Sequence, residues 1–268
     1  MEKKKGSSKS NYVLEIINLS KAFGKNQVLD GVDIRIPKGT VMGLMGENGA
    51  GKSTLMKCLF GMYAKDTGIF RLDGKEIDFK SSKEALENGV AMVHQELNQC
   101  LDRSIQDNIF LGRYITNFGV INEKVMYQKC IELFQELDMN FNPKVPMRIL
   151  SVSQCQMVEI AKAVSYKAKV VVLDEPTSSL SESETDKLFK IIRRLKDKGV
   201  SFIFISHKMN EIFNICDDIV VLRDGEVTLD KKIKDTNLDE VVKAMIGRNL
   251  SSRFPTLTSY PLLIKNLE

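Results

Sequence analysis

Residues 41–53 read Val-Met-Gly-Leu-Met-Gly-Glu-Asn-Gly-Ala-Gly-Lys-Ser. The apolar run Val41–Met45 is typical of a buried strand, and Lys52–Phe60 reads as a helix. Between them, Gly46–Ser53 matches the pattern G-x-x-x-x-G-K-[ST]. A strand, this loop and a helix in that order form a cradle of inward-pointing N–H groups at a helix N-terminus, which binds phosphate. The stretch therefore predicts a phosphate-binding loop in an α/β fold.

The side chains of this loop point to a nucleotide with a metal ion. Lys52 places a positive charge on the β- and γ-phosphates, and Ser53 offers a hydroxyl to Mg²⁺. We therefore expect ATP and Mg²⁺ as the cofactors. The residues expected to hold the nucleotide here are Gly46, Glu47, Asn48, Gly49, Ala50, Gly51, Lys52, Ser53 and Thr54.

Two acids follow a second apolar run, Val170–Leu173. At the carboxyl end of a parallel strand, Asp174 could hold Mg²⁺ through its water shell, and Glu175 could polarise the attacking water. Paired carboxylates after a strand are also common caps of the next loop. Their combination with the phosphate loop favours the hydrolytic role.

Two further polar residues follow predicted strands. His207 comes after Ser201–Ile205, from where an imidazole could reach a γ-phosphate and the attacking water. Gln95 comes after Val90–Val93, where a glutamine could bind Mg²⁺ or water. Taken alone, the histidine more often caps or fills a core, and the glutamine is more often a polar loop residue.

Ser151 and Gln154 form the pattern S-x-x-Q before a helical segment, which predicts a capping box. This helix N-terminus either is merely capped or binds phosphate from another molecule, and spacing does not decide between the two. Ser181 and Glu184 form a second capping box, for which we expect capping alone.

Apolar runs and helical periods alternate along the chain. Strand–helix alternation with buried strands implies a mostly parallel sheet that is covered on both faces. The early part is strand-rich with turn signals and predicts an antiparallel β subdomain, whereas residues 98–165 predict a helical subdomain. The fold class is thus α/β, a mostly parallel P-loop ATPase core with these two additions. The strand-rich segments of the early part are Val13–Ile17, Val28–Pro37 and Ile69–Phe79, with turn signals at Lys38-Gly39 and Asp73-Gly74. A later strand is predicted at Ile219–Leu222.

The composition of the chain argues against several classes of protein. The chain has 268 residues, 43% hydrophobic and 28% charged, with a net charge of +4. Its lysines are scattered among acids rather than arranged in a basic stripe, so we expect no nucleic-acid partner. The longest apolar runs are far below the ~20 residues of a membrane helix, and residues 1–10 predict a disordered tail. Five cysteines without a C-x-x-C pair fit reduced thiols.

One internal repeat extends beyond this domain. Tyr12–Leu19 and Tyr260–Leu267 share Tyr, Leu, Ile, Asn and Leu in the same frame. Either the match is coincidental or a second copy of the domain begins there. We therefore expect an ATP-binding domain over residues 11–250, followed over 251–268 by a linker and the start of a second, truncated domain.

With these pieces in order, residues 12–250 resemble the ATP-binding subunits of ABC transporters. The resemblance implies that Gly46–Ser53 is the Walker A loop and that Val170–Glu175 holds the Walker B strand and the catalytic base. It also implies that Gln95 is the Q-loop residue, that His207 is the H-loop switch and that Phe23 stacks on adenine. Leu150–Gln154 would be the signature that contacts phosphate across a dimer. It reads Leu-Ser-Val-Ser-Gln where the family commonly has Leu-Ser-Gly-Gly-Gln.

The departures resemble one branch, the monosaccharide importers with two ATPase copies in one polypeptide, with galactose and methyl galactoside import favoured. Ribose, xylose or nucleoside import remain alternatives, as does a soluble ABC translation factor that acts on the ribosome. The branch implies membrane permease subunits, a second ATPase domain in the same full-length chain or a homodimer, and, indirectly, an extracytoplasmic solute-binding protein. The expected location is the cytoplasmic face of the membrane.

Overall fold

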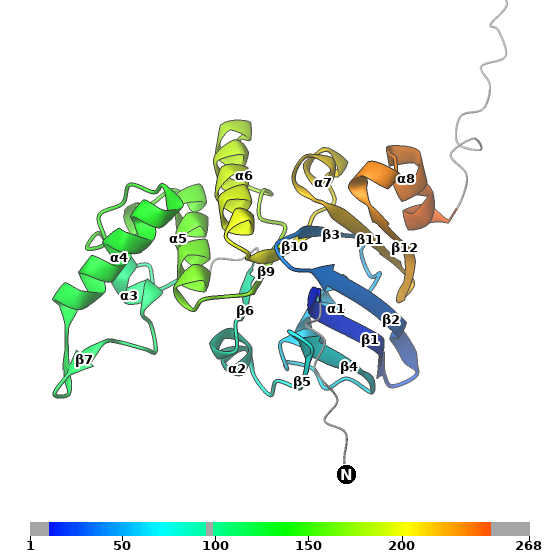
Figure 1. The fold of residues 1–268 in the computed structure, drawn as a ribbon, viewed down its shortest axis with the longest axis horizontal. Coiled ribbons are helices and arrows are strands. Elements are labelled where there is room, and N and C mark those ends of the chain that lie inside the picture. Colours follow the sequence, from blue (N-terminus) through cyan, green and yellow to red (C-terminus); the bar gives the residue numbers. More distant parts are fainter. Residues whose placement is uncertain (1–10, 95–98, 248–268) are drawn as a thin grey trace, which may run out of the picture.

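The structure, a computed structural model, describes residues 11–94 and 99–247. Figure 1 shows helices above the central sheet, an antiparallel sheet below it and, at the left of the view, a helical part that contains α3, α4 and α5. The central sheet has the order β12-β11-β3-β10-β9-β6. Its strands are β3 (Val41–Met45), β6 (Val90–Val93), β9 (Val170–Asp174), β10 (Ser201–Ile205), β11 (Asp218–Arg223) and β12 (Glu226–Lys232). All neighbours are parallel except β11 and β12, so the predicted mostly parallel sheet is confirmed.

Both faces of the central sheet are buried, because alternate residues of each strand enter different cores. In β9, Val170 and Val172 pack into one cluster, and Val171 and Leu173 into the other. Helix α1 (Lys52–Leu59) belongs to the first cluster, between the two sheets. The second cluster is covered by α6 (Glu182–Asp197), α7 (Met209–Ile215) and α8 (Leu238–Ile246), together with the helical part. Burial on both faces explains why these strands are continuous apolar runs rather than alternating ones.

The early strands form the predicted antiparallel sheet, in the order β2-β1-β4-β5. Its strands are β1 (Tyr12–Phe23), β2 (Asn26–Pro37), β4 (Thr67–Leu72) and β5 (Lys75–Ile77). The turn signal within Ile69–Phe79 is confirmed, because Asp73 and Gly74 both adopt positive φ and form the hairpin between β4 and β5.

Residues 99–165 are mainly helical, with α3 (Ile105–Ile109), α4 (Glu123–Leu137), the short 3-10 turn Met147–Ile149 and α5 (Val152–Ser165). Apolar residues on α4 and α5 recur at helical spacing and pack into the second core, as their periods predict. The sequence analysis missed the hairpin of β7 (Thr116–Asn117) and β8 (Val120–Ile121), which turns at Phe118 and Gly119. Such short strands carry too few residues for a period-2 signal.

Helix α2 (Ser82–Glu87) precedes β6, and Ser81 caps it. No helix among the described residues is long and apolar enough to cross a membrane. Several sequence predictions lie outside the described residues: the tail 1–10, Gln95, and the linker and second-domain start at 251–268, which include the repeat at Tyr260.

Candidate active site

Three neighbouring strands of the central sheet end at the predicted site residues. Strand β10 lies between β3 and β9, with Ile205 paired to Leu44 on one side and to Asp174 on the other. The phosphate loop follows β3, the two acids end β9, and His207 follows β10. Because carboxyl ends of parallel strands share one edge, the sheet order brings these segments together.

The loop between β3 and α1 has a backbone that two of its glycines make possible. Gly46 has a φ of 152°, and a Cβ there would lie 2.3 Å from the carbonyl oxygen of Leu222. Gly51 has a φ of 105°, and a Cβ there would lie 2.9 Å from the carbonyl oxygen of Val28. Gly51 is also the N-cap of α1 and forms no side-chain cap, so the first N–H groups of α1 are left for a ligand. Ser53 and Thr54 lie in this first turn, and Ser53 is exposed.

Lys52 folds back over the loop. Its Nζ donates to the carbonyl oxygens of Gly46 at 2.7 Å and Glu47 at 3.0 Å. Burial lowers the pKa of Lys52, and the charges of Glu175 and Asp174 oppose that shift. The ammonium group of Lys52 can exchange these two carbonyl oxygens for the oxygens of a phosphate. The loop therefore fits a phosphate chain.

Asp174 ends β9 and is partly buried. Burial raises the pKa of this carboxyl, the neighbouring charge of Glu175 raises it further, and His94 and Lys52 oppose the rise. His94 follows β6, whose Val93 pairs with Leu173. Gln95 itself lies outside the described residues, but the residue before it is thus electrostatically coupled to Asp174. A hard cation prefers such oxygen ligands, so Asp174 and the Ser53 hydroxyl fit Mg²⁺.

Glu175 and His207 are in direct contact. The Nδ1 of His207 lies 3.2 Å from Oε1 of Glu175. An ionised carboxylate can only accept, so this nitrogen carries the proton and donates. Glu175 has a φ of 45°, a left-handed conformation that costs a non-glycine residue about 1–3 kcal/mol. Its N–H donates to the carbonyl of Ile205 at 2.9 Å, which helps to hold that conformation.

The predicted capping box at α5 is confirmed. Ser151 Oγ accepts from the N–H of Gln154 at 3.3 Å, and Gln154 Oε1 accepts from the N–H of Ser151 at 2.9 Å. Ser153 is buried, and its hydroxyl donates to Oε1 of Glu184 at 2.5 Å. Val152 is half exposed. Among the hydrogen bonds of the described residues, none joins this box to the phosphate loop, so Ser151 and Gln154 are not part of the cluster around Lys52.

The family of the chain is shown by its similarity to known proteins. The sequence profile described as ABC transporter matches residues 29–178, more than half of the chain. The chain belongs to the ABC transporter family. The matched region includes the phosphate loop, Asp174 and Glu175.

Curated ABC proteins resemble the chain over nearly its whole length. A galactose/methyl galactoside import ATP-binding protein of Treponema denticola is 61% identical over 97% of this chain and 53% of its own length. The namesake from Treponema pallidum is 63% identical over 91% and 49%, and that from Escherichia coli K12 is 49% identical over 97% and 52%. The chain spans about half the length of the curated relatives it matches.

Solved ABC structures share the fold. A nucleotide-free ATP-binding cassette from an ABC transporter superposes with a TM-score of 0.77 at 25% identity, over 88% of this chain and all of that one. The cbiO1 protein of Clostridium perfringens, part of the ABC transporter complex cbiONQ, gives a TM-score of 0.75 at 25% identity, over 87% and 93%. The predicted fold class is therefore confirmed.

Phe23, the predicted adenine contact of this ABC chain, ends β1 and is 44% exposed. Its ring packs edge-on against Tyr63, with centroids 5.2 Å apart. Tyr63 follows α1, and the sequence analysis missed it because an isolated tyrosine in a loop has no period or motif. The exposed ring of Phe23, packed edge-on against the partly buried Tyr63, offers a face on which a base can stack.

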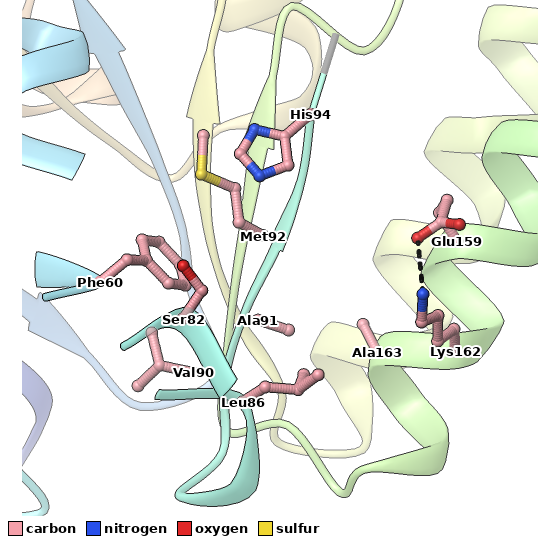
Figure 2. Close-up of a pocket in the computed structure, with 10 residues that line it drawn as sticks. All are labelled: Phe60, Ser82, Leu86, Val90, Ala91, Met92, His94, Glu159, Lys162 and Ala163. Atoms are coloured by element: carbon pink, nitrogen blue, oxygen red, sulfur yellow. Dashed lines mark ion pairs between the residues drawn. The ribbon is translucent and has the colours of Figure 1, made fainter. Parts of the chain in front are cut away.

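A cavity of about 180 Å³ lies between β6 and α5 of this ABC chain. Figure 2 shows Met92 of the edge strand β6 and His94, which follows it, on one side and Glu159 and Lys162 of α5 on the other. Glu159 and Lys162 form an ion pair at 3.8 Å. The cavity thus lies beside the end of β6, where the chain leaves the central sheet.

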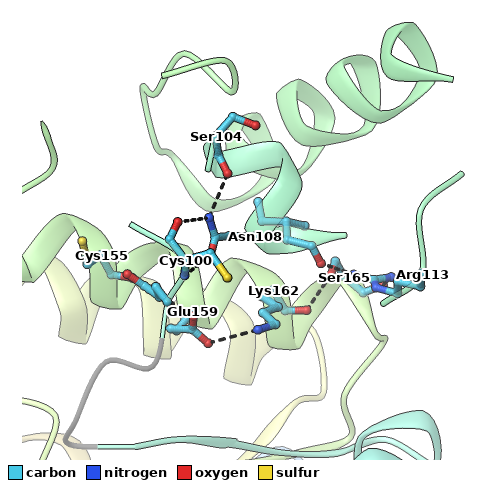
Figure 3. Close-up of polar contacts among 10 residues, drawn as sticks. Cys100, Ser104, Asn108, Arg113, Cys155, Glu159, Lys162 and Ser165 are labelled. Carbon is cyan, nitrogen blue, oxygen red and sulfur yellow. Dashed lines mark hydrogen bonds and ion pairs between the residues drawn. The ribbon is translucent and has the colours of Figure 1, made fainter. Parts of the chain in front are cut away.

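Gln99 and Cys100 form hydrogen bonds with residues of the helical part, and Figure 3 shows those of Cys100. The buried Asn108 accepts from the N–H of Cys100 at 2.9 Å and donates to its carbonyl at 3.1 Å. Gln99 Nε2 donates to the carbonyl of Cys155 at 2.8 Å and to Glu159 at 3.0 Å. The segment that contains Gln95 therefore joins the end of β6 to α3 and α5.

Proposed function

We propose that the chain is an ATP-hydrolysing domain of an ABC importer that energises uptake of a monosaccharide, galactose or methyl galactoside, through a separate membrane permease. The observation that carries this proposal is the meeting of Lys52, Glu175 and His207 at three adjacent strand ends. Hydrolysis of a phosphoanhydride needs phosphate recognition and a group that orients the attacking water, and a carboxylate–imidazole pair can supply the second.

The phosphate loop is the binding element. The N–H groups of the first turn of α1 would donate to the phosphate oxygens of ATP, and Lys52 would exchange its two carbonyl partners for phosphate oxygens. Phe23 and Tyr63 would stack on the base. Mg²⁺, when bound through Ser53, Asp174 and Gln95, would neutralise charge that develops on the phosphates.

Glu175 and His207 would carry out the hydrolytic step. Glu175 would orient the attacking water and accept its proton, because its carboxylate already lies beside the phosphate-facing edge of the sheet. His207, exposed over most of its surface and donating through Nδ1, keeps Nε2 free to contact the γ-phosphate and the same water.

The capping box of α5 would act on a second nucleotide. Ser151 and Gln154 would contact the phosphate bound by a second ATPase domain, in the same full-length protein or in a second copy of the chain. The inward turn of Ser153 supports this assignment, because it takes one of the two side chains that stand where the family commonly has glycine away from the approach. Val152 would remain beside the contact.

The names of the relatives support the proposed substrate. The three curated relatives described above are named for galactose and methyl galactoside import. We place the permease at the cavity between β6 and α5, because a segment bound there would act on both the core and the helical part. An extracytoplasmic solute-binding protein would act indirectly, and the chain would lie at the cytoplasmic face of the membrane.

The domain assignment is part of the same proposal. Residues 11–250 would form one ATP-binding domain with a helical lobe over about 98–165. Residues 1–10 would be a tail, and 251–268 a linker and the start of a second domain. The relatives are about twice as long as the stretch that this chain matches, which supports a second copy.

Two variants test the binding and hydrolytic roles separately. Lys52→Ala should weaken ATP binding about 100-fold or more, because it removes several charge-assisted hydrogen bonds. Glu175→Gln should keep ATP binding and lower turnover about 10²–10³-fold, by analogy with loss of a single transition-state contact. Calorimetric titration with Mg·ATP and a phosphate-release assay measure the two effects.

Lys75→Ala, an exposed lysine on β5, is the control and should change neither quantity. Micromolar ATP affinity in Lys52→Ala would exclude the proposed cradle. The sugar is tested by uptake of labelled methyl galactoside and ribose in cells that lack the gene for this chain. Loss of ribose uptake alone would contradict the galactoside assignment.

A further inference from the structure

A buried carboxylate behind the hydrolytic pair takes no part in the mechanism above. Glu211, in the first turn of α7, is only 9% exposed. Its Oε2 accepts from the hydroxyl of Thr177 at 2.6 Å and from that of Ser206 at 3.0 Å. Its Oε1 lies 3.0 Å from Nζ of Lys208. A buried carboxylate is stable only with such partners, so this arrangement is a fully paired polar cluster.

The partners of Glu211 come from the two loops that carry the hydrolytic residues. Thr177 is two residues after Glu175, whereas Ser206 and Lys208 flank His207. Lys208 adds one direct link between the loops, because its Nζ donates to the carbonyl of Thr177 at 3.2 Å. Its N–H donates within its own loop, to Ser206 Oγ at 3.1 Å. One side chain thus ties the loop after β9 to the loop after β10.

The position of the His207 side chain depends on this link between the loops more than that of Glu175 does. Its side chain is 64% exposed, against 27% for Glu175, so packing does little to fix the imidazole. Its contact with Glu175 at 3.2 Å requires the two loops to keep one relative position. Glu175 also sits at a φ of 45°, which persists only where the surrounding contacts impose it.

We infer that Glu211 is a positioning residue that holds His207 against Glu175. The inference rests on the proposed function, in which these two residues act on the same water. Glu211 touches neither the substrate nor the reacting atoms. It acts through Thr177 on one side and through Ser206 and Lys208 on the other.

The two histidines of the chain make this testable without hydrolysis. The ring signals of His207 and His94 can be followed by NMR in the full chain. In the wild-type background, Glu175→Gln should shift the His207 signals, because it removes the charge that Nδ1 faces. In a Glu211→Ala background, the same change should move His207 by less than about half as much. His94, which faces Asp174 rather than Glu211, reports that the fold is intact.

Turnover gives a second readout. Glu211→Ala should lower kcat about 10- to 100-fold while ATP affinity stays within about threefold, because a small misplacement of a reacting group is costly. Glu211→Gln should recover much of the loss, since one amide oxygen can still accept from both hydroxyls. Glu182 is an exposed acid of α6 that lines the same surface pocket as Glu211. Glu182→Ala is therefore the matched control and should leave both readouts unchanged.

If Glu211→Ala does not fold, Thr177→Val replaces it, because that variant removes one donor and leaves the carboxylate paired. An undiminished response of His207 to Glu175→Gln in the altered background overturns the inference, as does unchanged kcat. Absence of ATP binding in the wild type would instead contradict the proposed function, and the NMR comparison would still stand.

Discussion

Helices α1 and α5 both begin at predicted phosphate contacts, but their first turns differ. The N-cap of α1 is Gly51, in a left-handed conformation and with no side chain to satisfy the first N–H groups. The N-cap of α5 is Ser151, in an extended conformation, and it exchanges hydrogen bonds with Gln154. The first turn of α1 therefore offers its amides to a ligand in the same domain. The first turn of α5 is stable without a ligand and keeps fewer donors free.

The interactions that hold the two turns differ as well. Lys52 donates to carbonyl oxygens of the phosphate loop, and its ammonium group can exchange them for the oxygens of an anion. At α5, Ser153 is bound to Glu184 of α6, so the turn is fixed to a neighbouring helix.

The largest expected effect is at α1. Gly46→Ala should weaken ATP binding about 100-fold and lower the free energy of unfolding by about 2–4 kcal/mol, because its Cβ would overlap the backbone of Leu222. Gly49→Ala is the matched control, since its φ is also positive, at 88°, but beyond its chain neighbours no heavy atom lies within 4 Å of the place that a Cβ would take. It should cost only about 1 kcal/mol. Titration with ATP and denaturant unfolding measure both, and equal losses would contradict the cradle.

An intermediate effect is expected at the two capping boxes. Ser151→Ala and Ser181→Ala should each lower the free energy of unfolding by about 1 kcal/mol, because each removes a cap. Only Ser151→Ala should also lower ATP turnover, about tenfold, at protein concentrations where two ATPase domains associate. Equal turnover in both variants would show that the box at α5 is a cap and nothing more.

The smallest effect concerns the link between α5 and α6. Hydrogen bonds from Ser153, and then from Ser181, lower the pKa of Glu184 from 4.5 to about 2. A lowered carboxyl pKa stabilises the fold above the ordinary pKa, and that stabilisation is lost as the pH falls from 4.5 towards 2. Ser153→Ala should therefore reduce the fall in Tm between pH 5 and pH 2.5.

The control for this link is Glu184→Gln, which removes the titrating group. In that background Ser153→Ala should leave the pH dependence of Tm unchanged. A reduction of the same size in both backgrounds would mean that Ser153 acts through another acid.

Local signals in the sequence were enough for much of the site. The loop Gly46–Ser53, the acids after Val170–Leu173 and both capping boxes depend on residues close together in the chain, whose spacing alone determines their geometry. The same holds for the strand runs and helical periods. The turn at Asp73 and Gly74 was predicted from its residue types, whereas the hairpin at Phe118 and Gly119 was not, because its strands have only two residues each.

Contacts between distant segments were decided by the tertiary structure. The sequence by itself determined that Glu175 and His207 each follow a strand, but only the sheet order β3-β10-β9 sets their atoms 3.2 Å apart. The paired carboxylate of Glu211, the packing of Tyr63 on Phe23 and the inward turn of Ser153 have the same origin. Spacing along a chain specifies a turn, a strand or a cap, whereas neighbours across a sheet or between helices are chosen by the burial of both faces of the sheet at once.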